Sequence, residues 1–459
     1  FIFRRTLSNY CNNRVNYFMA QKHALIIGGG LGGLATALRL SAQGWGVTVC
    51  EAGSTVGGKM NRLSSNGIDF DTGPSLITMP WVFEELFKEA GSNFNEHVQL
   101  IPLNPLADYV YPDGTRLTYS TERSILLDTV RHLDKREEEG FNRFINLGKR
   151  IFDLSQVTFF RRPPLDPPTT ETLKALKHFP IRNAWGNYHK MVSAFFHNPY
   201  LQQLYDRYPT YVGSSPYRSP ATLNVIPYIE LTYGGWYIRG GLYCIIEALA
   251  KLAEQAGAAI FCEAAVQSIE HNNRRVRRVR LSSGECIDAD IIIMNGDASY
   301  APILLGESQA RPLPETERSM SGLVFLLGID RQLPALKHHT IYFSGDYQKE
   351  FKQLFEERRF PDDPTVYVNI GSHTDSSVTP GGGETLIIMA NAPANDTLWD
   401  ENKVDAARKA VFDRLRSSGF PEIQNDIIVS EVWTPTLIGQ RYHMPGGAIY
   451  GTHSHGWRS

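Results

Sequence analysis

The sequence predicts an α/β fold in which one parallel-sheet domain is assembled from separate segments and a second, α+β domain is built from the rest. Three observations support this prediction. An apolar strand runs into a glycine-rich turn at 28–33, a second apolar strand at 47–50 ends in an acid, and helix and strand patterns of the same kind return at 240–294. Strand, turn, helix and strand in this order are typical of a parallel βαβ unit.

The turn at 28–33 carries the Gly-x-Gly-x-x-Gly spacing of a dinucleotide-binding, Rossmann-like unit. Gly28 permits a tight turn, Gly30 lets the backbone approach a pyrophosphate, and Gly33 allows the helix to pack on the strand. These glycines predict that a phosphate group binds at the start of the following helix.

The residues around this fingerprint refine the prediction. Leu31 and Gly32 open the helix, where free N–H groups and the helix dipole favour an anion. Glu51 follows the second strand and is expected to bind the ribose hydroxyls of the dinucleotide. Because its carboxylate would repel a 2′-phosphate, the pattern disfavours NADP.

Between and after these segments the patterns change. Residues 81–90 predict an amphipathic helix, 109–119 predict a hairpin around a Pro-Asp-Gly turn, and a further helix is expected from Leu242. The first 18 residues are interpreted as an extension or fragment edge. The parallel-sheet domain is predicted at 19–80, 236–300 and 426–459, and the second domain at 81–235 and 301–425.

Composition restricts the partners of the protein. A net charge of −2 gives no general attraction for nucleic acid. No apolar run reaches the ~18 residues that a membrane span needs. The cysteines lack metal-ligand spacing, and we expect them to be free thiols in a reducing compartment. We also expect that the histidines near the end bind no metal. An arginine run at 274–280 is compatible with lipid phosphates or, more simply, with a solvated hairpin face.

Aromatic residues are concentrated at 195–237. Such side chains suit the walls of a long apolar cavity and suit a plain hydrophobic core equally well. Tyr211 and Trp236 in this stretch are candidate substrate contacts.

Four stretches give the chain its resemblance to a family. They are the fingerprint with Glu51 and Gly57-Gly58-Lys59, the stretch 70–78 around Gly-Pro-Ser, the stretch 234–241, and the end stretch 447–451. The chain resembles the FAD-dependent carotenoid desaturases of the bacterial and fungal phytoene desaturase type, within the flavin amine oxidase-like superfamily. The resemblance covers 19–455.

The resemblance implies a set of site residues. FAD would occupy the fingerprint, and the substrate side would be formed by Tyr211, Trp236 and the end stretch. The cofactor-binding residues that it implies are Gly28, Gly30, Leu31, Gly32, Gly33, Glu51, Gly58, Lys59, Gly73, Pro74, Ser75 and Val266, and the substrate-side residues are Tyr211, Trp236, Ala448, Ile449 and Tyr450.

The activity that the resemblance implies is desaturation of a carotenoid precursor, of the phytoene or diapophytoene type, by hydride transfer to flavin N5. It implies a lipophilic substrate and a peripheral position on the inner, cytoplasmic face of a membrane. It also implies a further glycine-rich segment beyond Ser459, so the cofactor domain is expected to be incomplete and FAD binding by this chain weak.

Several other functions fit the same fingerprint. A carotenoid isomerase, a retinol-type saturase, a terminal carotenoid oxidase and a hydroxycarotenoid 3,4-desaturase are the enzymatic alternatives, and an amine oxidase is less favoured. A GDP-dissociation-inhibitor-like protein that binds prenyl chains without catalysis is the alternative from another class. Retention of all three fingerprint glycines with Glu51 favours a working cofactor site.

Overall fold

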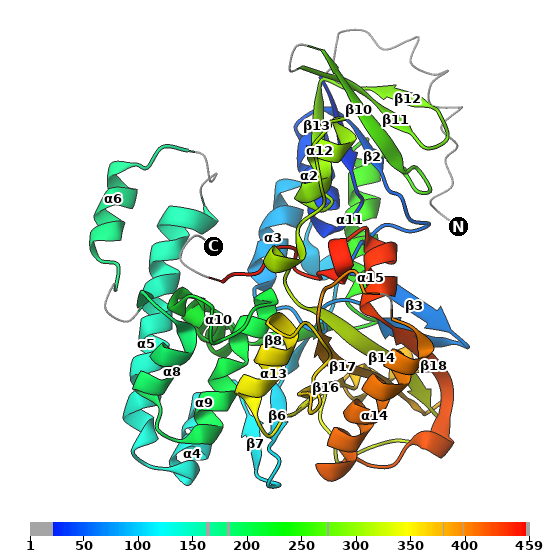
Figure 1. Cartoon of the computed structure of the whole chain (residues 1–459). Helices are drawn as coiled ribbons and strands as arrows, with labels where there is room; N and C mark the ends of the chain where they lie inside the picture. The colour runs from blue at the N-terminus through cyan, green and yellow to red at the C-terminus, as the bar shows by residue number, and fades with distance from the viewer. Residues whose placement is uncertain are drawn as a thin grey trace.

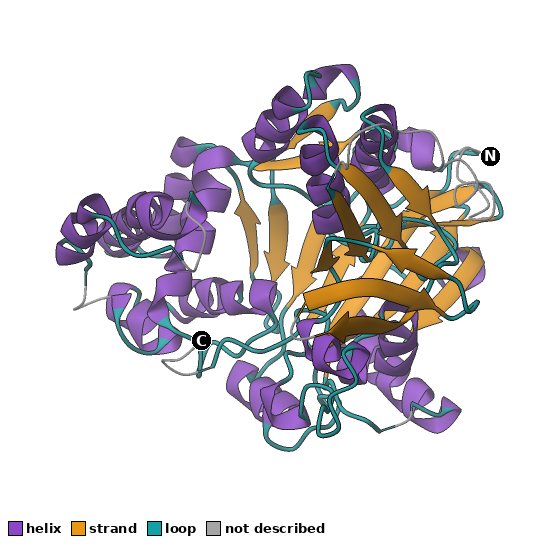
Figure 2. Cartoon of the chain, turned by 90° about the horizontal axis from the view of Figure 1, so that it is seen from above, coloured by secondary structure: helices purple, strands orange, loops and turns teal. Residues whose placement is uncertain are grey.

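The structure is a computed structural model that describes residues 22–161, 166–180, 184–272, 275–379, 381–397 and 399–455. The segment 1–18 lies outside the described residues. The described chain contains two large sheets and a group of helices to one side of them (Figures 1 and 2). None of the helices in these ranges combines the length and the apolar character that a membrane crossing would need.

The first sheet is parallel and has four strands, in the order β13 (Ile291–Met294), β1 (His23–Ile27), β2 (Gly46–Cys50) and β9 (Ala259–Phe261). Its strands are short apolar runs because helices cover the sheet. Helices α2 (Leu31–Ala42) and α11 (Tyr243–Gln255) pack against each other beside it. The predicted α/β fold from discontinuous segments is therefore confirmed.

A three-stranded antiparallel sheet extends this region at the top of Figure 1, with strands β10 (Val266–Asn272), β11 (Arg275–Leu281) and β12 (Cys286–Asp288). Arg278 lies 2.8 Å from Asp288, and Arg280 lies 2.6 Å from Glu270. These arginines pair with acids on neighbouring strands, as expected of a solvated hairpin face.

The second large sheet is mixed and has seven strands. Their order is β18 (Ile427–Trp433), β14 (Ser321–Ile329), β17 (Glu384–Ala392), β16 (Val366–Asn369), β15 (His339–Tyr342), β6 (Ala107–Val110) and β7 (Arg116–Tyr119). Strands β6 and β7 form the predicted hairpin. Helix α14 (Glu401–Ser417) buries Val411 and Leu415 in the same core as the sheet residues Phe325 and Ile388.

One boundary predicted from the sequence needs correction. The segment 426–459 was expected in the parallel-sheet domain, yet β18 pairs antiparallel with β14 along its length. Its backbone hydrogen bonds thus belong to the seven-stranded sheet. The remaining domain limits stay predictions.

The helical group surrounds α5 (Glu137–Ser155), which buries an apolar face against its neighbours. It includes α4 (Arg123–Leu133), the π-helix η3 (Gln156–Phe160), α6 (Thr170–Lys177), α8 (Tyr188–Phe195), α9 (Pro199–Asp206) and α10 (Val225–Tyr233), whereas α3 (Pro80–Glu89) contacts α2. The helix predicted at 81–90 and the helix predicted from Leu242 are both present.

Short elements connect the two large sheets. Strands β3 (Arg62–Ser65) and β4 (Ile68–Asp71) form a hairpin, and β5 (Leu100–Leu103) pairs with β8 (Gly235–Ile238). Helices α12 (Ala301–Leu304), α13 (Tyr347–Phe355) and α15 (Pro435–Tyr442) complete the chain. Strand β4 delivers the Gly-Pro-Ser stretch to the space between the sheets.

Candidate active site

Helix α2 begins with a site suited to an anion. Gly30 is its N-terminal capping residue, no described side chain caps the helix, and its first turn contains no acid. Gly32 is exposed and Leu31 half-buried. The positive end of the helix dipole is thus left available for a phosphate group.

Glycine is required at one position in the turn before this helix and at one position in the first turn of the helix itself. Gly28 has φ +101°, a conformation that favours glycine. A Cβ on Gly33 would collide with the carbonyl oxygen of Gly28 and lie 2.7 Å from Asn295 Nδ2. This close approach of helix to strand is the packing that the fingerprint predicts.

Glu51 is fixed beside this turn. Its Oε2 accepts a hydrogen bond from the Gly29 N–H at 2.7 Å, and its Oε1 accepts one from the Gly53 N–H at 2.7 Å. The Ala264 N–H donates to the Glu51 carbonyl at 2.8 Å, so the segment that leads into Val266 lies against the same turn. Gly28, Gly30 and Gly33, with the start of α2, form the glycine cradle. Glu51 and Val266, which are distant in sequence, are therefore brought close to this cradle.

Asn295 is a further residue of the cradle that the sequence analysis did not single out. It follows β13, and its Nδ2 donates to the Gly28 carbonyl at 3.0 Å. Its Oδ1 would lie 2.8 Å from a Cβ on Gly32. The sequence did contain a signal for Asn295, because it directly follows an apolar strand and dinucleotides bind at the carboxyl ends of parallel strands.

The stretch 57–59 joins the cradle to the end of the described chain. The Gly57 N–H donates to the Gly29 carbonyl at 2.9 Å, and a Cβ on Gly58 would lie 3.2 Å from Gly30 Cα. Lys59 Nζ donates to the carbonyl of Ile449 at 2.7 Å. Burial lowers the pKa of Lys59, and the nearby Asp297 carboxylate acts in the opposite direction.

A cavity of about 500 Å³ lies between the seven-stranded sheet, the helical group and the stretch 71–78. Most of the predicted residues beyond the cradle line it, and its wall includes apolar residues of the seven-stranded sheet, such as Leu326 and Ile387. The predicted residues in its wall are Lys59, Gly73, Pro74, Ser75, Tyr211, Ile449 and Tyr450.

Two predicted substrate contacts lie elsewhere. Ala448 is fully buried, and Trp236 is outside the described cavity wall, with its indole N–H donating to the Tyr233 carbonyl at 3.0 Å. Most aromatic residues of 195–237, including Phe196 and Tyr205, pack in the main hydrophobic core. Of the aromatic residues in that stretch, Tyr211 lines the cavity, and the core interpretation describes most of the others.

Polar groups hold the Gly-Pro-Ser stretch in place. Asp71 accepts hydrogen bonds from the Leu242 N–H at 2.9 Å and the Tyr237 hydroxyl at 3.1 Å, and burial raises the pKa of its carboxyl group. The Tyr367 hydroxyl donates to Ser75 Oγ at 2.6 Å. A Cβ on Gly73 would collide with the Lys59 carbonyl oxygen, so only glycine allows the two stretches to approach this closely.

The cavity also contains charged and polar residues that the sequence analysis missed. Arg207, Glu230 and His339 line it. Burial raises the pKa of Glu230 and lowers the pKa of His339 to about 4. Arg207 and Glu230 lie within the aromatic stretch 195–237. A charged residue among aromatic residues that are typical of a core could have indicated a functional site there.

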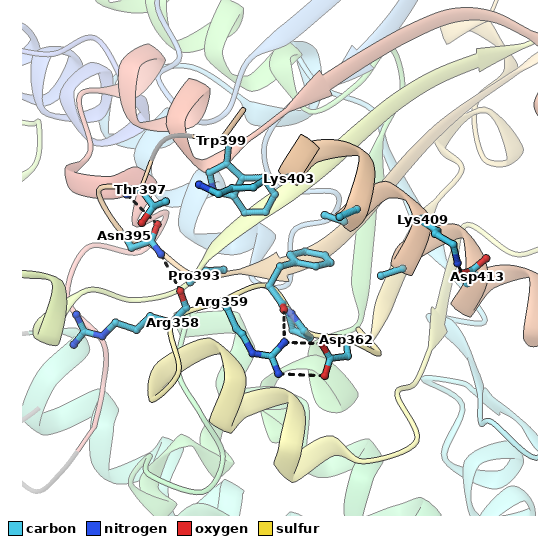
Figure 3. Close-up of a pocket in the computed structure, with 15 residues that line it drawn as sticks. Arg358, Arg359, Asp362, Pro393, Asn395, Thr397, Trp399, Lys403, Lys409 and Asp413 are labelled. Atoms are coloured by element: carbon cyan, nitrogen blue, oxygen red, sulfur yellow. Dashed lines mark hydrogen bonds and ion pairs between the residues drawn. The ribbon is translucent and has the colours of Figure 1, made fainter. Parts of the chain in front are cut away.

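A second cavity, of about 530 Å³, lies beside α14 and shares no lining residue with the first (Figure 3). Its wall includes Phe360 and Trp399, whose rings meet edge to face with centroids 5.8 Å apart. Arg359 is paired with Asp362 in its wall. Lys59 and the stretch 73–75 line the first cavity and do not line the second, so we place the active site in the first cavity.

The histidines near the end have protein partners. His453 Nε2 lies 2.9 Å from the Thr316 carbonyl oxygen, and His455 Nε2 accepts from the Ser215 N–H at 3.0 Å. Within the described ranges, no group of three His, Cys, Asp or Glu side chains is arranged to hold a metal ion.

The fold and the cradle define a dinucleotide-binding protein, and a largely apolar cavity lies beside its Gly-Pro-Ser stretch. A profile of the flavin containing amine oxidoreductases matches residues 31–444, and the chain belongs to this family. It is an FAD-dependent oxidoreductase. The open helix N-terminus, the glycine turn that a Cβ would fill and the fixed Glu51 all fit FAD.

Individual relatives are more specific. The chain is 32% identical over 440 residues to a 4,4'-diapolycopene oxygenase of Methylomonas sp, covering 94% of this chain and 88% of the relative. It is 34% identical over 446 residues to a 4,4'-diaponeurosporene oxygenase of Staphylococcus aureus (strain bovine RF122 / ET3-1), with the same coverage. Among solved structures, an oxidoreductase from Methanosarcina mazei matches with a TM-score of 0.58 at 17% identity, over 90% of this chain and 87% of that chain.

Proposed function

We propose that this flavoenzyme oxidises a terminal carbon of an acyclic carotenoid. The observation that carries the proposal is the cavity against the seven-stranded sheet, which has apolar walls and is lined by the Gly-Pro-Ser stretch and Ile449. The two relatives described above are carotenoid oxygenases, which supports a carotenoid substrate and favours terminal oxidation. Desaturation of phytoene or diapophytoene, which the motifs favour, is the second candidate.

The residues of the chain would mainly position the substrate. FAD, when bound, supplies a hydride acceptor. The walls formed by Leu326, Ile341 and Ile387 would orient the polyene and exclude water. Lys59 would hold the stretch that contains Ile449 against the cofactor cradle.

Substrate choice would depend on shape and end groups. Burying apolar carbon from water contributes ~0.8 kcal/mol per CH₂. A carotenoid leaves a bilayer that is as apolar as the cavity, so this contribution largely cancels. Cavity length, curvature and the polar groups at its wall would then discriminate between substrates.

The test is to express the protein in cells that supply phytoene, diapophytoene or diaponeurosporene and to analyse the pigments by chromatography and mass spectrometry. Terminal oxidation of a methyl group to an aldehyde by molecular oxygen, with release of one water, adds one oxygen to the pigment and removes two hydrogens. Desaturation removes two hydrogens alone, saturation adds two, and isomerisation leaves the mass unchanged. Pigments that gain no oxygen in any of these cells would contradict terminal oxidation.

We also propose that the protein is cytoplasmic and binds the inner face of a membrane through α6 and η3. Leu173 and Leu176 of α6 are 51% and 49% exposed, and Phe160 of η3, which contacts α6, is 46% exposed. Lys174 and Lys177 accompany the leucines. Exposed apolar residues beside lysines are typical of a helix that lies in the interface of an anionic bilayer.

Two further observations support this location. Figure 1 shows α6 at the outer end of the helical group, away from both large sheets. The four described cysteines are free thiols, as is usual in a reducing compartment.

Sedimentation with anionic vesicles tests the membrane proposal. The double variant L173E/L176E should bind vesicles at least about tenfold more weakly, because two apolar anchors become charges that anionic lipid repels. I428E is the control, since Ile428 is 53% exposed but lies on β18. Equal binding by the double variant and the wild type would refute this contact surface.

A further inference from the structure

The cavity beside the cofactor cradle contains one arginine in an unusual setting. Arg207 directly follows α9 and lines the same cavity as Gly73 and Ser75. Its guanidinium lies near two aromatic rings, 5.4 Å from the centroid of Tyr211 and 5.8 Å from that of Tyr367. These contacts hold the cation in the wall of a pocket that is otherwise suited to hydrocarbon.

Arg207 has no counter-ion among the residues that the structure describes. No described carboxylate lies within ion-pair distance, and its guanidinium bonds tyrosine hydroxyls instead: Nη1 donates to Tyr211 at 3.4 Å, and a second hydrogen bond joins it to Tyr109. A guanidinium has five N–H donors, so most of its donor capacity remains unused. Arg207 is half-buried, and cations withdrawn from water are normally paired, so a guanidinium without a counter-ion in a cavity wall is available to an anionic ligand.

Glu230 is the nearest candidate for a partner, but its oxygens are already engaged. The Tyr208 hydroxyl donates to Oε1 at 2.6 Å, and the Tyr211 hydroxyl donates to Oε2 at 2.9 Å. Tyr211 therefore connects the two residues: it accepts from Arg207 and donates to Glu230. This arrangement fixes Arg207 without neutralising it directly.

A second unused polar atom lies in the same wall. His339 is 3% exposed, and its Nδ1 lies 2.9 Å from the carbonyl oxygen of Leu106, to which it must donate. Its Nε2 is then an acceptor, and it has no partner within the described part of the chain. A hydrocarbon offers nothing to this nitrogen or to the guanidinium.

We propose that Arg207 binds an oxygen-bearing end group of the polyene, a carboxylate or an aldehyde. The inference rests on the proposed function and deepens it, because it extends the substrate class from hydrocarbon polyenes to polyenes in which one end already carries oxygen. The cavity then selects by charge as well as by shape. Apolar walls accept the chain, and the charge-assisted hydrogen bond from the guanidinium fixes one end.

The test measures binding of two probes to the FAD-loaded protein by quenching of tryptophan fluorescence. The probes are crocetin, an acyclic polyene diacid, and its dimethyl ester, which has the same chain without charge. We expect wild type to bind the acid about tenfold more tightly than the ester, because only the acid offers an anion. In R207Q the acid-to-ester ratio should fall to about one, with the affinity for the ester unchanged.

Two variants provide controls. R207K keeps the charge but not the planar donors, and it should retain part of the preference. R408Q should retain all of it, because Arg408 stacks 5.9 Å from the centroid of Phe325 and neither residue lines the cavity.

The proposal is overturned if R207Q keeps the acid preference or if wild type binds both probes equally. It is also overturned if R207Q changes the flavin reduction potential and leaves the ratio unaltered, since the cation would then serve the cofactor. Failure of wild type to bind either probe counts against the proposed function as well. A normal ratio with no pigment oxidation contradicts the proposed function alone.

Discussion

At the scale of single residues, Gly33 shows how one missing side chain allows a cofactor site to form. The residue is buried where α2 meets the turn after β1, and the Gly28 carbonyl oxygen occupies the space of a Cβ. With glycine there, the helix N-terminus can approach a pyrophosphate. The cost of any larger residue is therefore paid in cofactor binding as well as in packing.

G33A should weaken FAD binding by more than about tenfold and lower the free energy of unfolding by about 1–3 kcal/mol, because the new methyl group forces α2 away from the turn. Flavin absorbance after gel filtration and chemical denaturation measure the two effects. T36A, on the same helix, loses one hydrogen bond to the Gly32 carbonyl and is the control. Stoichiometric flavin in G33A would contradict the role of the close contact.

His339 gives a pH prediction at the same scale. Burial lowers its folded-state pKa to about 4, below the ordinary value of 6.5. Since the unfolded chain takes up the proton first, this neutral histidine contributes stability above pH 6.5 that is lost as pH falls toward 4. H339N should lose this dependence, because the asparagine amide can still donate to Leu106 but does not titrate.

The lowered pKa of His339 sets the size of this change in the free energy of unfolding. The difference in free energy of unfolding between wild type and H339N should shrink by about 3 kcal/mol between pH 6.5 and pH 4. Urea titrations at several pH values measure it, with H132N, at an exposed position, as the comparison. A constant difference across that range would rule out a buried neutral His339.

The residues that could be predicted from sequence are those whose role depends on local backbone chemistry. Gly28, Gly33 and Glu51 belong to one continuous βαβ unit, so spacing alone places them. Asn295 and Arg207 depend on contacts between distant segments, which spacing does not encode. They are brought to the site by the pairing of β13 with β1 and by the position of α9 beside the cavity.

At the scale of elements, strand β4 and helix α11 are joined by a single carboxylate. Asp71, at the end of β4, accepts from the Leu242 N–H just before α11 begins. A carboxylate at a helix N-terminus satisfies unpaired N–H groups and interacts favourably with the helix dipole. The cavity wall around Asp71 therefore depends on the start of α11.

D71A should lower the free energy of unfolding by about 1–3 kcal/mol, since it leaves a buried N–H and the Tyr237 hydroxyl without their acceptor. D71N, which keeps one acceptor oxygen, should lose less. D69A is the matched control, because Asp69 lies on the same strand and bonds the exposed Ser64. Chemical denaturation of the three variants measures the order, and equal losses in D71A and D69A would show that the contact contributes little.

Elements whose contacts are close in sequence could be predicted, and elements whose contacts are distant in sequence could not. The hairpin of β6 and β7 was predictable because a turn signal lies between two β-type runs. The membership of β18 was not, because its pattern does not specify whether it pairs with β14 or with the parallel sheet. Likewise, aromatic residues suit a core and a cavity wall alike, and only packing separates Tyr205 from Tyr211.

At the scale of the whole molecule, the cofactor site is assembled from both ends of the described chain. The Lys59–Ile449 hydrogen bond joins residues 390 positions apart, and the cradle also takes contacts from β13 and from the turn before β10. A ligand that touches all these segments stabilises the fold as a unit. Because it binds the native state and not the unfolded chain, it raises the free energy of unfolding by mass action.

FAD should therefore raise the melting temperature of the protein. At a concentration about 100 times its Kd, the added stability is about 2.7 kcal/mol, which corresponds to a rise of a few degrees. NADP⁺ should give no rise, because its 2′-phosphate would meet the carboxylate of Glu51, which two backbone N–H groups hold beside the cradle. E51Q removes that charge. The variant should show a smaller difference between the melting-temperature rises with FAD and with NADP⁺, because FAD binds more weakly and NADP⁺ is repelled less. Differential scanning calorimetry of wild type and E51Q with each nucleotide measures these rises. An equal rise in melting temperature with FAD and NADP⁺ in wild type would mean that Glu51 does not face the ribose. The dinucleotide would then have to lie differently across the cradle.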